Sequence, residues 1–472
     1  MTADTQEHAR ARFILADRYA LRGWLFSPHC LLDLKFRSVT RLSAEEFETL
    51  ARCDGTHEDG ATPTLARFIE KGIVRPCGEG EHLAPEQRYR TYDNWLFESV
   101  HWAITGRCNF NCIHCFAAAG TAPTTGELNL DGCLRIIDEF EHAGIQRVYL
   151  TGGEPLLRSD FLDITEALAQ HGIRVESIGT NGSLVTDEFL DALEAQGHRP
   201  NFLVSFDGIG HHDWMRGVKG AEERTLAGIR RIKAHGLRVS ATSCLSRGNL
   251  DTVRETTRLL EEMGVDLLRV VRVAESLRWI EEAPGMNLPV EEYLEFILGY
   301  VDWFLGEDIP MDVEIWGILH HAAGSATCLL TQWHDCTPAS DHLQSCCGDA
   351  RRMPFVAHDG EIALCNQMSG YVHSGGIRWG NVPETPLPEL FRDSPFTDQL
   401  LCTQELIRAH NPACLTCEWR GQCNCGCRAN ALADSRDIMG TDPLTCVFFR
   451  KGYFDRFREM VARHGFEACP AD

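Results

Sequence analysis

The chain has 472 residues and a formal net charge of −23, with 44% hydrophobic and 24% charged residues. This length implies two or three domains, and the composition is that of a globular protein with a sizeable core. The negative charge excludes broad electrostatic binding to nucleic acid or to an anionic membrane surface. The sequence shows no apolar run of membrane-spanning length and no apolar signal core near the start, which predicts a cytoplasmic location.

Residues 1–95 are predicted to form a small α+β unit, in which short apolar runs broken by glycine and proline indicate strands. The run LSAEEFETLARCDG predicts a helix that Ser43 caps, with Glu46 at capping-box spacing and Gly55 closing the end. A second helix is predicted over TPTLARFIEKGIV. Residues 54–64 read as a polar connector between the two helices.

Residues 96–320 alternate strand patterns with helical patterns such as CLRIIDEFEHAG. The strand-like runs are VHWAIT, RVYLT, RVESIGT, NFLVSF, LRVSATS and LLRVVRV. Six βα units in succession predict a parallel sheet with helices outside, which right-handed crossovers curl into a full or partial barrel. The active site is then expected at the carboxyl ends of the strands.

Residues 321–472 are rich in cysteine and poor in periodic pattern until near the end of the chain. The whole chain has 21 cysteines, and a reducing cytosol does not favour a disulfide framework. Metal or cluster ligation is the leading explanation because thiolates suit iron–sulfur chemistry, although some cysteines are expected to be buried apolar residues. A loop-rich segment of this kind needs internal links, such as bound metal, to hold its fold.

The first cysteine motif follows the strand VHWAIT, where Cys108, Cys112 and Cys115 have the spacing CxxxCxxC. Three thiolates on one loop can hold three irons of a 4Fe–4S cube and leave the fourth iron open to a chelating ligand. The alternatives are a chance grouping or a zinc site, although zinc knuckles usually pair CxxC halves.

The next strand ends in TGGEP, which contains Gly152, Gly153 and Glu154. Two glycines at a strand end let the backbone approach a ligand closely, and Glu154 can accept a hydrogen bond from an ammonium group. By itself this sequence is a common turn.

The CxxxCxxC loop followed one βα unit later by GGEP resembles the radical S-adenosylmethionine (radical SAM) superfamily, over roughly residues 97–320. The resemblance implies a partial (β/α)6 TIM-like barrel whose open iron binds S-adenosylmethionine. It implies that reduction, by a partner such as ferredoxin or flavodoxin, yields a 5′-deoxyadenosyl radical that removes hydrogen from a substrate.

Further strand ends fit the resemblance: Thr180 and Asn181 end the third strand, Ser205 and Asp207 the fourth, and Arg216 follows in HDWMRG. The resemblance implies that Ser205 contacts the ribose or methionine end of the cofactor and that Arg216 binds its carboxylate. The alternative for each residue is a cap or turn role.

The second cysteine region, built around CxxCx5Cx3C, resembles the SPASM extension of radical enzymes that act on peptides and proteins. The resemblance implies two auxiliary 4Fe–4S clusters. One would use Cys347, Cys365, Cys427 and one cysteine further upstream, and the other would use Cys414, Cys417, Cys423 and Cys446.

The upstream ligand stays open between Cys328, Cys336 and Cys346, or that cluster has three protein ligands and an open iron. Cys425 is an extra thiol inside the motif. The alternative is a zinc-stapled structural domain.

Within residues 1–95, the run LLDLKFRSVTRLSAEEFETLARCDGT followed by LARFIEKGIV resembles PqqD-like domains. These are small winged-helix-like units that hold the leader of a ribosomally synthesised precursor peptide by strand addition. The alternative is a structural cap on the barrel. The chain is thus predicted to be α/β, with a recognition domain over 1–95, a radical SAM partial barrel over 96–320 and a loop-rich iron–sulfur domain over 321–472.

The predicted function is maturation of a precursor peptide through a thioether or carbon–carbon crosslink. A formylglycine-forming oxidase of the sulfatase-maturing kind is one alternative, although it needs no leader-binding domain. Peptide epimerisation is another and would use a cysteine hydrogen donor, for which Cys244 at the end of the fifth strand is the candidate. A non-catalytic iron–sulfur or zinc scaffold that binds peptides is the fourth.

Overall fold

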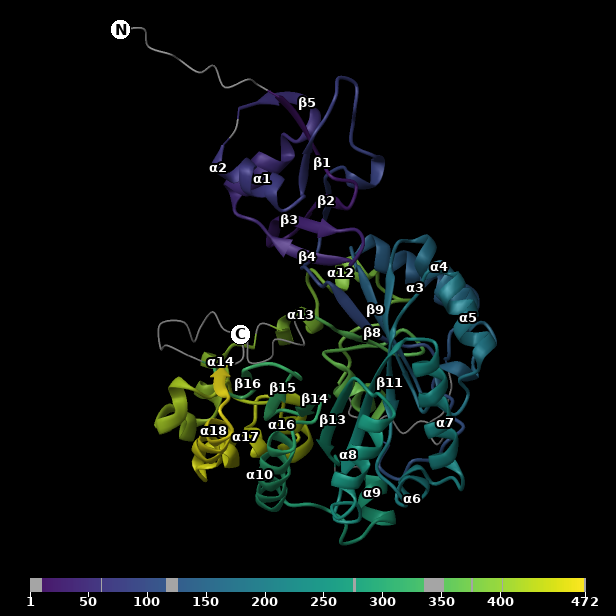
Figure 1. The fold of residues 1–472 in the computed structure, drawn as a ribbon, viewed down its shortest axis with the longest axis vertical. Coiled ribbons are helices and arrows are strands. Elements are labelled where there is room, and N and C mark those ends of the chain that lie inside the picture. Colours follow the sequence, from purple (N-terminus) through teal and green to yellow (C-terminus); the bar gives the residue numbers. More distant parts are fainter. Residues whose placement is uncertain are drawn as a thin grey trace.

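The computed structural model describes residues 11–60, 62–115, 126–274, 277–334, 352–374, 377–400 and 402–470. Figure 1 shows a small N-terminal unit at one end, a curved sheet with helices in the middle, and a helical C-terminal region beside it. Within the described residues, no helix is both long and apolar enough to cross a membrane.

The N-terminal unit has two small sheets and two helices around a core that includes Leu15, Leu50 and Phe68. One sheet has the order β5-β1-β6 and the other β4-β3-β2-β7. The elements are β1 (Ala11–Leu15), β2 (Tyr19–Trp24), β3 (Ser27–Asp33), β4 (Ser38–Arg41), α1 (Ala44–Ala51), β5 (Asp54–Asp59), α2 (Pro63–Glu70), β6 (Val74–Pro76), η1 (Pro85–Gln87) and β7 (Arg90–Tyr92).

The predicted capping box of α1 is present, because Ser43 Oγ accepts from Glu46 N at 3.2 Å and Ser43 N donates to Glu46 Oε2 at 2.8 Å. The predicted end of this helix at Gly55 is wrong, since α1 ends at Ala51 and Gly55 lies within β5. The polar connector predicted over residues 54–64 is also wrong in its first half. Strand β5 pairs with β1 at the edge of its sheet, where backbone bonds hold a strand without apolar side chains.

The N-terminal unit is fixed to the end of α3 (Leu130–His142). Trp24 Nε1 and Asn94 Nδ2 both donate to Ala143 O, at 3.3 and 3.1 Å. Gly144 has a φ of +75°, and a Cβ there would lie 2.8 Å from both Trp24 and Tyr92. A side chain at this position would therefore displace the N-terminal unit from the end of α3.

The central sheet has twelve strands in the linear order β18-β17-β8-β9-β10-β11-β12-β13-β14-β15-β16-β19, so the barrel is open. The six predicted strands are all present and mutually parallel, and β14 extends them. Their bounds are β8 (Ser99–Ala103), β9 (Arg147–Thr151), β10 (Arg174–Thr180), β11 (Asn201–Ser205), β12 (Arg238–Leu245), β13 (Leu267–Arg272) and β14 (Asp312–Ile315).

Strands from the cysteine-rich region join both edges of this sheet. Strand β17 (Phe355–Val356) pairs in parallel with β8 and carries β18 (Ile362–Ala363). At the other edge lie β15 (Leu319–His321), β16 (Thr327–Leu330) and β19 (Glu467–Pro470). The C-terminal region is therefore built onto the barrel by backbone hydrogen bonds.

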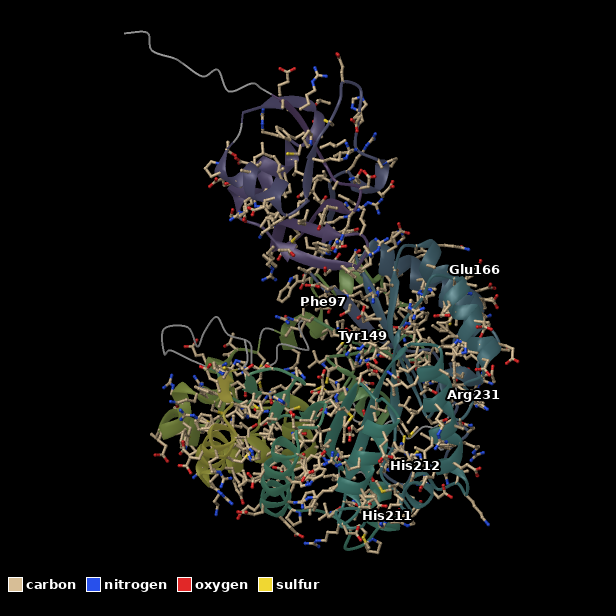
Figure 2. The ribbon with its side chains drawn as sticks, in the orientation of Figure 1. Phe97, Tyr149, Glu166, His211, His212 and Arg231 are labelled. Carbon is tan, nitrogen blue, oxygen red and sulfur yellow. The ribbon has the colours of Figure 1, made fainter. Side chains whose placement is uncertain are left out.

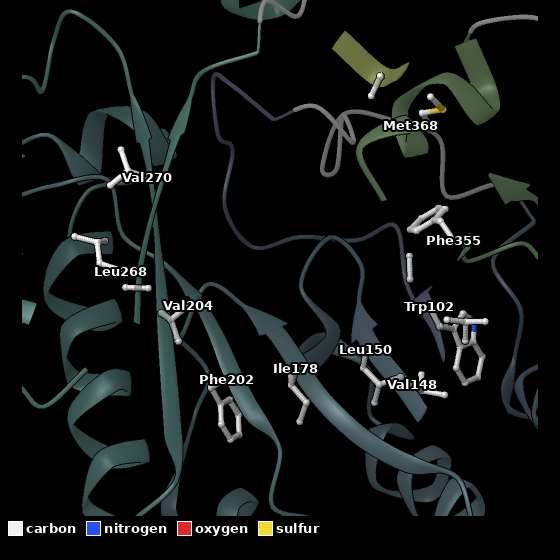
Figure 3. Close-up of a cluster of buried hydrophobic side chains, with 14 of the residues drawn as sticks. Trp102, Val148, Leu150, Ile178, Phe202, Val204, Leu268, Val270, Phe355 and Met368 are labelled. Carbon is white, nitrogen blue, oxygen red and sulfur yellow. The ribbon is translucent and has the colours of Figure 1, made fainter. Parts of the chain in front are cut away.

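Helices cover the outer face of the sheet. They are α3, α4 (Phe161–Gln170), α5 (Asp187–Ala195), α7 (Ala221–Ala234), α8 (Val253–Glu262) and α10 (Val290–Gly306). Three shorter helices follow the ends of β9, β11 and β13; they are η2 (Pro155–Leu157), α6 (His212–Arg216) and α9 (Leu277–Glu282). Alternate strand residues such as Trp102, Val148 and Phe202 are fully buried in this layer, and Figure 3 shows them on neighbouring strands. Figure 2 shows Tyr149 within the body of the sheet, with Glu166 and Arg231 on the outer helices.

The C-terminal region consists mainly of short helices. They are η3 (Asn366–Met368), α11 (Ser369–Ser374), α12 (Leu387–Leu390), α13 (Pro395–Leu400), α14 (Gln404–His410), α15 (Pro412–Leu415), η4 (Glu418–Gly421), α16 (Arg428–Ser435), α17 (Pro443–Arg450) and α18 (Tyr453–Arg463). Helix α18 packs against α10 and α17, so the last helix anchors the region to the barrel.

Candidate functional site

The three cysteines of the first motif lie on the loop that follows β8, as predicted, and each is partly exposed. Helix α6 braces this loop, because Asn111 N donates to Arg216 O at 3.0 Å and Ile113 N donates to Met215 O at 3.1 Å. Burial raises the pKa of Cys108 to about 11, so a bound metal or cluster is needed to hold it as a thiolate at neutral pH.

The glycines of the TGGEP segment let it lie directly against the cysteine loop. Gly153 N donates to Thr105 O at 2.8 Å, and Glu154 N donates to Arg107 O at 2.7 Å. A Cβ on Gly152 would lie 2.5 Å from Thr105 O, and one on Gly153 would collide with Arg107 O. The sequence predicted that these glycines let the backbone approach a ligand closely. In the structure the close approach is made to the backbone of the cysteine loop.

Glu154 is completely buried and joins the ends of β9 and β10. Its carboxylate accepts from Thr180 Oγ1 at 2.8 Å, Asn181 N at 2.7 Å and Leu156 N at 3.1 Å. Burial outweighs these hydrogen bonds and raises the pKa of Glu154 to about 7. Asn181 in turn donates to Asn109 Oδ1 at 2.8 Å, which connects this carboxylate to the cysteine loop.

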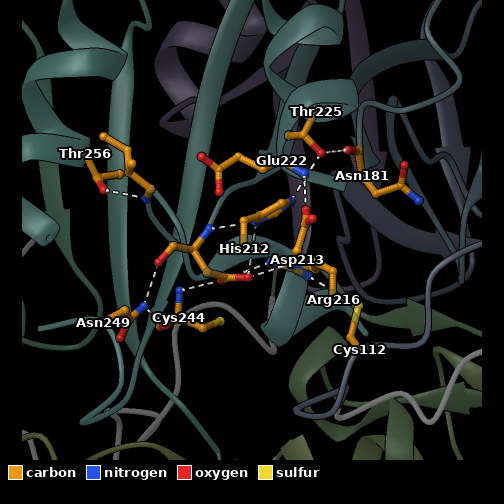
Figure 4. Close-up of polar contacts among 12 residues, drawn as sticks. Cys112, Asn181, His212, Asp213, Arg216, Glu222, Thr225, Cys244, Asn249 and Thr256 are labelled. Carbon is orange, nitrogen blue, oxygen red and sulfur yellow. Dashed lines mark hydrogen bonds and ion pairs between the residues drawn. The ribbon is translucent and has the colours of Figure 1, made fainter. Parts of the chain in front are cut away.

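Arg216 is held by Asp207 and reaches the cysteine loop. Figure 4 shows the Arg216 side chain beside Cys112. Its Nε lies 2.7 Å from Asp207 Oδ2, its Nη2 donates to Asp207 Oδ1 at 3.0 Å, and its Nη1 lies 3.6 Å from Cys112 Sγ. Burial disfavours the Asp207 carboxylate, but the charge of Arg216 and a hydrogen bond from His212 hold its pKa well below the ordinary value. The pair thus presents a fixed cation beside a cysteine of the motif.

Cys244 and Ser205 lie near this pair of residues. The Cys244 backbone donates to Asp207 Oδ1 at 3.1 Å, and its thiol, a His114 ring nitrogen and an Asp207 oxygen lie within 4.8 Å of one another. Burial raises the pKa of Cys244 to about 12, so the group is a thiol at neutral pH. Ser205 ends β11 in register with Thr242 of β12 and is partly exposed.

The inner face of the sheet carries polar residues that were not singled out from the sequence. His101, Tyr149, Ser177 and Asn201 lie in register on four adjacent strands. The buried atoms His101 Nδ1 and Ser177 Oγ have no hydrogen-bond partner within the described structure. Alternation of polar and apolar residues along each strand is the signal that would have found them.

Two oppositely charged residues extend this inner face on β13 and β14, where Arg269 Nε donates to Glu314 Oε2 at 2.8 Å. Burial, and then the charge of Arg269, lower the pKa of His101 to about 4, which leaves its ring neutral. A neutral imidazole with an unpartnered nitrogen can hydrogen-bond a substrate as donor or acceptor.

One pocket in the second cysteine region gathers all four thiols predicted for one auxiliary cluster. The cysteines that line it are Cys414, Cys417, Cys423, Cys425 and Cys446. Four thiols around one cavity fit a cubane cluster, and the neighbouring guanidinium groups of Arg408 and Arg450 suit its negative charge.

The other predicted auxiliary cluster is only partly described. Cys427 Sγ lies 3.4 Å from Gln367 Oε1, which brings Cys427 beside the segment that carries Cys365. Cys328 is buried in β16, with its sulfur 3.4 Å from His321 Nδ1. The remaining candidates lie outside the described residues; they are Cys336, Cys346 and Cys347.

Comparison with known proteins agrees with this geometry. Residues 102–260 match the family model of the radical SAM superfamily. An AdoMet-dependent heme synthase of Nitratidesulfovibrio vulgaris is 27% identical over 353 residues, which cover 73% of this chain and 91% of that protein. The PqqA peptide cyclase of Ruegeria pomeroyi is 26% identical over 347 residues, which cover 72% of this chain and 85% of that protein.

Two kinds of solved structure share the fold. Streptococcus suis SuiB bound to its precursor peptide SuiA has a TM-score of 0.62 at 14% identity, covering 92% of this chain and 99% of that chain. Native anSMEcpe with bound AdoMet has a TM-score of 0.58 at 15% identity, covering 78% of this chain and 97% of that chain. The match to the family model confirms the predicted radical SAM domain over residues 102–260, the domain of enzymes that use a 4Fe–4S cluster and S-adenosylmethionine.

Proposed function

We propose that this enzyme modifies a ribosomally synthesised precursor peptide, whose leader the N-terminal unit holds while the barrel acts on the core. The observation that carries this proposal is the N-terminal unit itself. The likeness to SuiB covers 92% of the chain and so must include most of that unit, whereas the heme synthase match leaves 27% of the chain uncovered. A radical enzyme acting only on a small molecule has no need of such a unit.

The N-terminal unit offers an edge on which a peptide strand can add. Strand β4 is at one end of its four-stranded sheet, and its residues are partly or fully exposed. Phe36, in the turn before β4, is 47% exposed and supplies apolar surface beside that edge. An added strand gains backbone hydrogen bonds from the edge, and side-chain pockets give it specificity. This is the binding mode expected of a PqqD-like domain.

The strand ends supply the residues proposed to hold the cofactors. Cys108, Cys112 and Cys115 would hold the cluster, and Glu154 and Arg216 suit the ammonium and carboxylate groups of S-adenosylmethionine. When bound, these groups supply the one-electron chemistry that removes a hydrogen atom from a substrate. Gly152, Gly153, Thr180, Asn181, Ser205 and Asp207 are proposed to shape the same cofactor site.

The polar inner face is proposed to orient the peptide. Neutral His101 and Ser177 present unpaired polar atoms there, and Arg269 paired with Glu314 can bind a side chain of either charge. Removal of one hydrogen atom, one proton and one further electron, with an auxiliary cluster accepting the electron and solvent the proton, would close a thioether or carbon–carbon crosslink. Ferredoxin or flavodoxin is the proposed external reductant.

A second candidate function is tetrapyrrole modification. It is favoured by the curated relatives, since heme synthases of two further organisms match 74–79% of this chain at 26–28% identity. Peptide epimerisation is a narrower variant of the main proposal and would use Cys244, which is held as a thiol near the cysteine loop. Formylglycine formation is the variant that leaves the N-terminal unit unused.

The deciding experiment uses the full-length enzyme reconstituted with iron and sulfide without oxygen, a reductant, and the peptide encoded beside its gene. Formation of 5′-deoxyadenosine together with loss of two hydrogens from the peptide supports the proposal. Deuterium uptake from heavy water without other mass change indicates epimerisation. Turnover of a porphyrin with an unmodified peptide overturns the proposal in favour of tetrapyrrole chemistry, and zinc without iron overturns both.

A further inference from the structure

The pocket of the second cysteine region contains one thiol more than a cubane cluster needs. Cys414, Cys417, Cys423 and Cys446 complete the four iron sites, yet Cys425 lines the same pocket. Two residues separate Cys414 from Cys417, but only one separates Cys423 from Cys425, so these two sulfurs share a single short turn.

Cys425 occupies a backbone conformation that a residue with a Cβ rarely adopts. Its φ is +70°, and Gly426 follows at +74°, so two successive residues are left-handed. The amide of Cys425 points at its neighbour and donates to Cys423 Sγ at 3.4 Å. Such a strained position persists only where the surroundings enforce it.

Contacts on both sides of this turn enforce its shape. Arg428, which is 5% exposed, donates to Cys425 O and also to Gly440 O at 2.8 Å. A Cβ on Gly426 would lie 2.5 Å from Asp442, which accepts from Cys427 N at 2.9 Å. The turn is therefore rigid, and it holds Cys423 and Cys425 side by side at the pocket wall.

Cys425 lies beside Cys423 in the lining of the pocket, because its own amide is bonded to the Cys423 sulfur. The Cys425 side chain packs against the buried cluster of Cys402 and Ile407, and its sulfur lies 4.0 Å from Gln404 O.

We propose that Cys425 is an alternate ligand of this auxiliary cluster, able to bind the iron that Cys423 serves. The inference rests on the proposed function, because it requires that the pocket hold a 4Fe–4S cluster. In the exchange, the iron–sulfur bond to Cys423 breaks and one to Cys425 forms, while the proton of the Cys425 thiol passes, directly or through solvent, to the released Cys423 thiolate. No electron is transferred.

The test compares iron and sulfide contents of the anaerobically reconstituted full-length protein with those of Cys423→Ala, Cys425→Ala and the double variant. Cys414→Ala is the matched control, since its nearest thiol in sequence, Cys417, is already a ligand. We expect both single variants at the 423–425 turn to keep the iron content of the wild type. The double variant and the control should each lose about four irons per chain.

The electron paramagnetic resonance spectrum gives a second readout. In Cys423→Ala the auxiliary signal should persist at shifted field positions, because a different sulfur binds the iron. Iron retained by the other clusters and an unchanged circular dichroism spectrum report that each variant folds.

Loss of four irons from Cys423→Ala overturns the proposal, as does their loss from Cys425→Ala alone, which would make Cys425 the regular ligand. Full iron in the double variant or in Cys414→Ala overturns the proposal together with the auxiliary cluster itself. A wild-type protein without an auxiliary cluster removes the cluster part of the proposed function, so the two failures are distinguishable.

Discussion

The cysteine loop after β8 and the cysteine pocket of the C-terminal region hold thiols in two different ways. The loop keeps its three cysteines close in sequence and is braced by the ends of a parallel sheet. The pocket draws its thiols from α15, α17 and the connecting segments between them, and it is braced by side chains, such as Arg408 donating to Arg420 O at 2.8 Å and Cys423 O at 2.9 Å. The sheet makes the loop a local feature, whereas the pocket exists only once the whole region has folded.

The largest effect expected is that of Cys112→Ala in the loop. It removes one of three ligands from the proposed catalytic cluster, so 5′-deoxyadenosine formation should fall to background with about four irons lost. High-performance liquid chromatography of the products and iron analysis measure this result. Turnover at the wild-type rate would break the assignment of the loop as the catalytic centre.

Cys414→Ala in the pocket should sharpen the contrast between the two sites. The barrel and its loop stay intact, so S-adenosylmethionine should still be cleaved while the modified peptide disappears. We expect cleavage within about threefold of the wild type, a change of less than about 1 kcal/mol in the barrier. Parallel loss of both products would show that the two sites do not act separately.

Arg428→Ala tests whether side chains brace the pocket. The buried guanidinium bonds to four carbonyls, of Cys425, Gly426, Ile438 and Gly440, and their loss should cost about 3 kcal/mol of unfolding free energy. Chemical denaturation measures the change, and the exposed Arg230→Ala is the matched control, expected within about 0.5 kcal/mol of wild type. Equal stability of both variants would count against this role.

Glu154 at the sheet end should give the smallest effect, a dependence of stability on pH. Its pKa of about 7 in the folded protein exceeds the unfolded value, so its contribution is fully present below about pH 4 and is lost as pH rises through 7. Between pH 5 and 7 the cofactor-free wild type should lose about 2 kcal/mol relative to Glu154→Gln. Thermal unfolding of both proteins across this range gives the difference, and parallel curves would contradict it.

The barrel could be predicted from sequence because its signals are local. Each strand and helix has its own periodicity, and the Cys108 loop and the TGGEP segment sit at strand ends where chain order fixes their neighbours. Strand β5 was missed because an edge strand needs no apolar pattern. The polar residues of the inner face, from His101 to Asn201, were missed because only the register of several strands brings them together.

The C-terminal region could be predicted only in part. The resemblance to SPASM extensions indicated which thiols between Cys414 and Cys446 converge, but it did not reveal the strands that join the barrel sheet at both edges. Short strands such as β17 carry too few residues for a periodic signal, and their pairing with β8 depends on long-range contacts.

The contact of the N-terminal unit with the end of α3 at Gly144 fixes the distance between the proposed leader site and the barrel. Trp24 and Asn94 both bond to Ala143 O, which fixes this unit relative to the strand ends of the barrel. When the leader of a precursor is bound by the N-terminal unit, the length of peptide between leader and core decides which core residue reaches the strand ends. Adding or deleting residues between leader and core should then move the modification along the peptide by the same number of positions. A bulky residue at position 144 should make the modified position less precise.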